Sequence, residues 1–147
     1  MKAYEIKGNP TINGTINVQG SKNSSLAIIV ASLLCKDVVI LSNVPKIKDI
    51  YELLMILKKI NVNVSFIDNN LIIDSTNIIY KPLLMEEIQR FRASYYFIGA
   101  FLSLFNEVEI YYPGGCNIGK RPIDQHIKGL SNLDVSLVLT SDVIKAY

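Results

Sequence analysis

Hydrophobic residues recur at helical spacing in four stretches of the chain. Residues 22–35 are apolar on nearly all faces, as in a buried helix, and Ser21 before them is a favourable N-cap. Residues 47–61 are amphipathic, with apolar side chains at three- and four-residue intervals at Ile50, Leu53, Leu54, Leu57 and Ile60. Helices are also predicted over residues 92–105 and 123–134.

Shorter stretches predict β-strands between these helices. Strands are expected over residues 37–44 and 107–113, and a strand pair around a turn over 135–147. Residues 63–68 and 70–75 predict two strands joined by the turn-prone pair Asn69–Asn70. Near the N-terminus, residues 3–20 show short alternation of apolar and polar residues, interrupted by Gly8, Pro10 and Gly14. This pattern predicts a β-hairpin.

The order of elements from residue 22 recurs from residue 92. One constant offset aligns Lys22 with Arg92, and it places Val38 and Ile40 on Val108 and Ile110. Later positions, such as Leu57 and Leu130, align only when the offset is increased by three, so the second copy has gained three residues before its second helix. The sequence therefore predicts an α/β fold built from two repeats, with extra residues on a loop of the second.

Composition narrows the class of protein. The 147 residues are 50% hydrophobic and 19% charged, which is enough apolar material for one core, and the net charge is only +2. No long basic patch suggests a nucleic-acid or membrane partner. The longest apolar run, residues 26–35, is too short to span a bilayer, and the start lacks a signal-peptide core, so we expect a cytosolic protein.

Two cysteines stand far apart in a chain with a single histidine. No metal-type spacing is present, so no zinc site is predicted, and both thiols are expected to be free in a reducing compartment. Cys35 lies on the apolar helix and is predicted to be packed in the core.

Lys22 and Arg92 occupy equivalent positions in the first turns of two predicted helices. A helix N-terminus binds phosphates and carboxylates, and a nearby cation reinforces such a site. The alternative is that both side chains simply extend into solvent. Asn23, next to Lys22, is suited either to hydrogen-bond a hydroxyl group or to serve as a cap.

The inserted loop, "PGGCNIGKRP" at residues 113–122, holds a cysteine among glycines and two cations. Lys120 and Arg121 would favour the thiolate of Cys116, which could then exchange protons or attack an anionic substrate. A small residue without chemistry in a tight turn is the alternative. His126, close to Asp124, is either a surface residue or a ligand contact.

Four segments of the chain resemble, in order and spacing, the N-terminal part of the UDP-N-acetylglucosamine 1-carboxyvinyltransferases, which belong to the enolpyruvyl transferases. These segments are "GSKNSSL", "NVPKIKDI", "RASYYFIGAFL" and "PGGCNIGKRPIDQHIKGL". The related shikimate-pathway transferases have the same repeated fold but lack the cysteine loop. The resemblance covers essentially the whole chain.

The resemblance implies transfer of the enolpyruvyl group of phosphoenolpyruvate to the 3′-hydroxyl of UDP-N-acetylglucosamine, in bacterial peptidoglycan synthesis, with no metal and no organic cofactor. It makes Cys116 the general acid and the target of fosfomycin, and it assigns Lys22 and Asn23 to phosphoenolpyruvate. Arg92 and Arg121 would meet phosphate charge. The stretch Arg121, Pro122, Ile123, Asp124 and Gln125 would contact the UDP-sugar.

The resemblance also implies a fold, the inside-out α/β barrel of βαβαββ units, of which two are present here. Residues 1–21 would form a hairpin belonging to the second domain of the full-length family. Residues 22–147 would be an incomplete catalytic domain, with repeat one at 22–91 and repeat two at 92–147. The family's catalytic Asp base would lie outside this sequence.

Three functional interpretations follow. The chain is the N-terminal part of a bacterial cytoplasmic transferase, inactive when isolated; or a non-catalytic remnant that binds a nucleotide sugar; or one half of a split enzyme. The expected partners are phosphoenolpyruvate, UDP-N-acetylglucosamine and a missing C-terminal portion, or further copies of the chain through self-association.

Overall fold

The computed structural model describes residues 3–5, 7–8, 11, 13–90, 92–114 and 122–147. The first repeat contains α1 (Lys22–Ala31), η1 (Ser32–Cys35), β1 (Val38–Ser42), α2 (Lys48–Lys59), β2 (Asn63–Ile67) and β3 (Asn70–Asp74). Helix α3 (Glu86–Arg90) follows β3, still within the predicted bounds of repeat one. The second repeat contains η2 (Arg92–Tyr95), α4 (Tyr96–Phe105), β4 (Val108–Tyr111), α5 (Asp124–Ser131), β5 (Leu137–Leu139) and β6 (Val143–Ala146). The predicted α/β repeat is confirmed.

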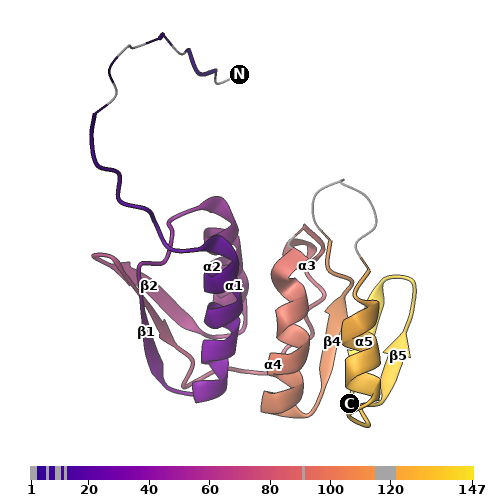
Figure 1. Ribbon diagram of the computed structural model, residues 1–147. Helices are drawn as coiled ribbons and strands as arrows, with labels where there is room; N and C mark the ends of the chain where they lie inside the picture. The colour runs from indigo at the N-terminus through magenta and orange to yellow at the C-terminus, as the bar shows by residue number, and fades with distance from the viewer. Residues whose placement is uncertain (1–2, 6, 9–10, 12, 91, 115–121) are drawn as a thin grey trace.

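Each repeat forms its own three-stranded antiparallel sheet. The strand orders are β1-β3-β2 and β4-β6-β5, so the last strand of each repeat lies in the centre. Helices α1 and α4 lie side by side between the two sheets (Figure 1). The turn between β2 and β3 is formed by Asp68 and Asn69, one residue earlier than predicted, with Asp68 at a φ of 54°.

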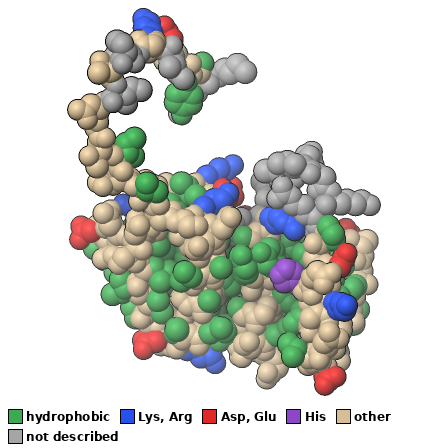
Figure 2. All heavy atoms as spheres, viewed as in Figure 1, with side chains coloured by type: hydrophobic (Ala, Val, Ile, Leu, Met, Phe, Trp, Pro, Cys, Tyr) green, Lys and Arg blue, Asp and Glu red, His purple; other side chains and the backbone are tan. Residues whose placement is uncertain are grey.

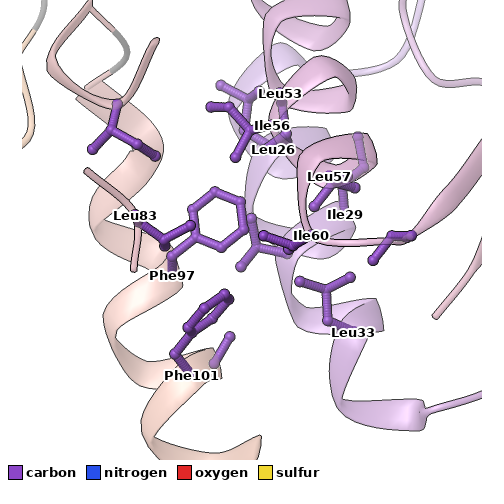
Figure 3. Packing of buried hydrophobic residues seen from close by; sticks show 14 of the residues in the cluster. Leu26, Ile29, Leu33, Leu53, Ile56, Leu57, Ile60, Leu83, Phe97 and Phe101 are labelled. Carbon is purple, nitrogen blue, oxygen red and sulfur yellow. The ribbon is translucent and has the colours of Figure 1, made fainter. Parts of the chain in front are cut away.

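The core lies where α1, α2 and α4 meet. Phe97 and Phe101 of α4 are fully buried and pack edge to face, with ring centroids 5.9 Å apart. Figure 3 shows them pointing toward apolar side chains of α1 and α2, among them Ile29 and Leu57. All five apolar positions predicted for the buried face of residues 47–61 are buried: Ile50, Leu53, Leu54, Leu57 and Ile60.

The first helix has a side-chain N-cap, and the C-terminal ends of the first helices are alike in the two repeats. The Ser21 hydroxyl accepts a hydrogen bond from the Ser24 amide at 3.4 Å, which confirms the predicted N-cap of α1. At the other end, Lys36 and Asn106, which are equivalent positions of the two repeats, both adopt the left-handed conformation, with φ of 50° and 61°. The chain is thereby turned into β1 and β4 in the same way.

The alignment of the two strands that follow was wrong by one residue. Val108 and Ile110 face the core, but the predicted alignment pairs them with Val38 and Ile40, which are 52% and 61% exposed. The inward residues of β1 are Val39 and Leu41. The shift arises between the left-handed residue and the strand, because two residues separate Lys36 from inward-facing Val39 whereas one separates Asn106 from Val108. A one-residue shift exchanges the two faces of a strand.

Cys35 corrects a second prediction, because it is exposed rather than packed in the core. It is the last residue of η1, and its neighbours Leu34 and Lys36 are exposed as well. The apolar run therefore turns only part of its surface inward. Ile28, also on this run, is 50% exposed.

Iodoacetamide is expected to alkylate Cys35 rapidly in the folded chain, because its side chain is accessible to the reagent. The sequence alone predicted labelling of Cys116 with Cys35 protected. Peptide mapping of a Cys116→Ser variant after brief treatment measures the reactivity of Cys35 directly. Labelling of Cys35 only after denaturation would contradict its exposure.

The N-terminal arm, residues 3–20, does not form the predicted hairpin among its described residues. Residues 13–19 carry no strand or helix and lead away from the two sheets (Figure 1). Ile16 and Val18 on this arm are 90% and 87% exposed. The assignment of residues 1–21 to a second domain stays a prediction. In the part of the chain that the structure describes, no helix has the length and apolar character needed to cross a bilayer.

Candidate functional site

The helices of both repeats begin at one end of the molecule. Helix α1, η2 with α4, and α5 all start there, as do the segments that leave β1 and β4 (Figure 1). Figure 2 shows Lys and Arg side chains at this end. Helix N-termini carry partial positive charge and free N–H groups, so this end favours anions.

Lys22, the first residue of α1, forms an ion pair with Asp49 of helix α2 in the same repeat. Its Nζ donates a hydrogen bond of 2.8 Å to Oδ2 of Asp49, in the first turn of α2. The two side chains are 50% and 40% exposed, so both remain accessible to a ligand. Asn23 follows Lys22 on the same turn and is exposed. Lys22 therefore does not simply extend into solvent.

Asp49 is a residue that the sequence reasoning missed. It is separated from Lys22 by 27 positions, and its place in the first turn of a helix is explained equally well by the helix dipole. The signal that was available is the repeated architecture, because it brings the starts of α1 and α2 together.

Arg92 begins η2 next to an aromatic cluster. Tyr95 lies 4.4 Å from Tyr96 and 4.7 Å from the imidazole of His126 in α5, measured between ring centroids. Burial, followed by a hydrogen bond with Tyr96, raises the pKa of Tyr95 to about 12, and the charge of Arg92 acts in the opposite direction. The phenol is therefore neutral over the physiological range. His126 therefore packs against Tyr95, the last residue of η2.

The predicted cysteine loop begins and ends at the same end of the molecule. At its start, Gly114 lies so close to α3 that a Cβ atom on it would be 1.1 Å from the carbonyl oxygen of Gln89, so only glycine fits. At its end, Pro122 is exposed and Ile123 is buried at the start of α5. Cys116 and Arg121 lie outside the described residues.

The structure therefore brings several predicted residues to one end. Asp124 and Gln125 are exposed in the first turn of α5, which also contains His126. Lys22 and Arg92 lie at the starts of α1 and η2. The described residues include no cluster of His, Cys, Asp and Glu arranged to hold a metal. A groove of about 260 Å³ lies elsewhere, beside the C-terminal end of α2 and the edge strand β2.

Known proteins resemble this chain in both sequence and fold. The family model described as EPSP synthase (3-phosphoshikimate 1-carboxyvinyltransferase) matches residues 6–146. A UDP-N-acetylglucosamine 1-carboxyvinyltransferase of Prochlorococcus marinus subsp. pastoris is 44% identical over 99% of this chain and 32% of its own length. UDP-N-acetylglucosamine 1-carboxyvinyltransferase 2 of Latilactobacillus sakei is 46% identical over 90% of this chain and 32% of its own length.

Among solved structures, the enolpyruvyl transferase NikO from Streptomyces tendae superposes with a TM-score of 0.76 at 18% identity, covering 91% of this chain and 30% of that one. This likeness bears on the fold. The chain spans about a third of the length of the curated relatives that it matches. With a match over nearly all of its residues, the chain belongs to the EPSP synthase family of enolpyruvyl transferases.

Proposed function

We propose that this chain supplies the acid and the anion-binding half of an enolpyruvyl transfer site, as the N-terminal part of a UDP-N-acetylglucosamine 1-carboxyvinyltransferase. The observation that carries the proposal is that Lys22, Arg92 and both ends of the cysteine loop lie at the same end of the molecule, where the helices begin. Relatives that are 44% and 46% identical bear this enzyme's name.

Lys22 and Asn23 are proposed to bind phosphoenolpyruvate. The ligand carries a phosphate and a carboxylate, and the α1 N-terminus offers free N–H groups beside the Lys22 ammonium. Asp49 accepts a hydrogen bond from that ammonium at 2.8 Å and so fixes its position beside the start of α1. Arg92 is proposed to meet further phosphate charge, since it lies at the start of the second repeat's central helix.

Cys116 is proposed to protonate C3 of phosphoenolpyruvate while the 3′-hydroxyl of the sugar adds to C2 and loses its proton to a base. The tetrahedral product then expels phosphate, and loss of a proton from C3 restores the enol double bond. Lys120 and Arg121 would favour the thiolate that accepts this proton.

The UDP-sugar is proposed to lie along Arg121, Pro122, Ile123, Asp124 and Gln125. The described part of this stretch suits the role, because Asp124 and Gln125 are exposed on the first turn of α5 while buried Ile123 anchors them. The bacterial cytoplasm is the proposed location and peptidoglycan synthesis the proposed pathway. Both rest on the likeness to the bacterial relatives.

Replacing Lys22 by glutamine is expected to weaken phosphoenolpyruvate binding. A charge-assisted hydrogen bond typically contributes about 1.5–3 kcal/mol, or roughly ten- to a hundredfold in affinity. Isothermal titration with phosphoenolpyruvate measures the change. Lys58→Gln is the matched control, since Lys58 is exposed near the opposite end of α2. Equal affinities for the two variants would contradict the proposed role of Lys22.

A further inference from the structure

Helix α5, which carries two of the proposed UDP-sugar contacts, buries none of its own residues fully. Its half-buried side chains Ile127 and Leu130 rest against the core, and Ile123 just before the helix is buried. Asp124 and Gln125 in the first turn are exposed. Because helices in proteins are held mainly by buried side chains, the place of this first turn depends on the contacts made there.

One contact at the first turn of α5 is made by two rings. The imidazole of His126 lies 4.7 Å from the ring of Tyr95, the last residue of η2, at an interplanar angle of 55°. Tyr95 is half-buried, and its ring is 4.4 Å from that of Tyr96, with which it shares a hydrogen bond. Aromatic rings at such separations attract one another. Tyr95 therefore joins η2, which begins with Arg92, to the first turn of α5.

The first repeat has an aliphatic side chain where the second has His126. In the alignment that pairs Leu57 with Leu130, His126 corresponds to Leu53. Leu53 is fully buried among the apolar side chains between α1 and α2 (Figure 3). A position that served packing alone would be expected to keep an aliphatic residue. The imidazole appears in the repeat that carries the cysteine loop, which points to a role at the site.

We propose that Tyr95 is a positioning residue of the transfer site, which holds the first turn of α5 against η2 through its ring contact with His126. This contact fixes Asp124 and Gln125 relative to Arg92, so that the groups proposed for the sugar and for phosphate charge stay in register. The inference rests on the proposed function. It adds that binding of the nucleotide sugar depends on Tyr95, whereas binding of phosphoenolpyruvate at the start of α1 does not.

The only histidine of the chain gives a direct test of the contact. In proton NMR spectra of the full chain, the ring current of Tyr95 is expected to displace the His126 ring protons from their positions in the unfolded chain. Tyr95→Ala removes this displacement, whereas Tyr95→Phe keeps most of it because the ring remains. Identical His126 resonances in the wild type and Tyr95→Ala would overturn the inference.

Titration of the full chain with UDP-N-acetylglucosamine, followed by amide chemical shifts, tests the role of the contact. Tyr95→Ala is expected to weaken binding by roughly two- to tenfold, the effect of one lost aromatic pair, and Tyr95→Phe to bind nearly as the wild type does. Phosphoenolpyruvate should bind Tyr95→Ala with unchanged affinity. Tyr51→Ala is the matched control: it removes a ring 5.9 Å from Phe66 in the first repeat and should change neither affinity.

The outcomes separate this inference from the proposed function. A wild-type chain that does not bind the nucleotide sugar would contradict the proposed function, and the inference would fall with it. Wild-type affinity for the sugar in Tyr95→Ala would overturn the inference alone, as would an equal loss of affinity for both ligands. Circular dichroism checks the fold. Tyr95→Leu fills the half-buried space without a ring and gives the same comparison if the alanine variant does not fold.

Discussion

Phosphate release from phosphoenolpyruvate and UDP-N-acetylglucosamine is expected to stay at background when the chain is assayed alone. Addition of the sugar hydroxyl needs an acid at C3 and a base at the hydroxyl, both within hydrogen-bond reach. The proposed acid is Cys116. The resemblance places the Asp base outside the residues of this chain, which spans 32% of its Prochlorococcus relative.

Activity is expected to appear when the remaining two thirds of a relative are supplied as a second polypeptide. One member of a general acid–base pair commonly contributes about 10²–10⁴ in rate, so Cys116→Ala in the assembled pair should lower turnover by that factor. Phosphate release is followed continuously, with the second polypeptide alone as the control. Turnover by the purified chain alone, with its mass verified, would contradict the division of the pair.

Replacing Phe97 by alanine is expected to lower the free energy of unfolding more than any conservative change at the surface. Its ring is fully buried between α4 and the first repeat, and it contacts Phe101 edge to face. Truncating a buried aromatic side chain leaves a cavity and typically costs about 3–5 kcal/mol, a large share of a domain's total stability. Urea unfolding followed by circular dichroism measures this loss.

Gly99→Ala is the matched control on the same helix. A Cβ atom at Gly99 would have nothing within 4 Å, so the substitution adds no clash, and alanine in a helix interior is favoured over glycine by about 0.5–1 kcal/mol. The two variants should therefore shift the urea midpoint in opposite directions. Similar midpoints for Phe97→Ala and the wild type would mean that α4 does not hold the two repeats together.

Periodicity predicted the elements that bury one face. The amphipathic pattern of residues 47–61 gave the buried side of α2, and the repeat gave the equivalent starts of α1 and η2. It missed α3 and the bridge formed by Leu83, because residues 76–91 contain Pro82 and show no sustained period. That bridge depends on a partner, Ile110, in a distant part of the sequence, which no local pattern reports.

Exposure was predicted less well than secondary structure. Cys35 lies in an apolar run and nevertheless faces solvent, because only one side of α1 and η1 meets α2 and α4. Contacts within the candidate site, like side-chain exposure, depend on tertiary packing that local sequence patterns do not report. The positions of Lys22 and Arg92 were predicted from the repeat, whereas the pairing of Lys22 with Asp49 arises from tertiary packing.

The left-handed residues Lys36 and Asn106 mark corresponding corners in two copies of one unit. Each copy closes its own sheet, so a change in the segment after β4 leaves the hydrogen bonds of the first sheet intact. Because the unit is duplicated, the loop proposed to carry the reactive cysteine belongs to one copy, and the sheet of the other copy folds without it. The connection after β1 is short, whereas the one after β4 is long, so residues inserted after β4 can vary while the first sheet keeps its own strand pairing.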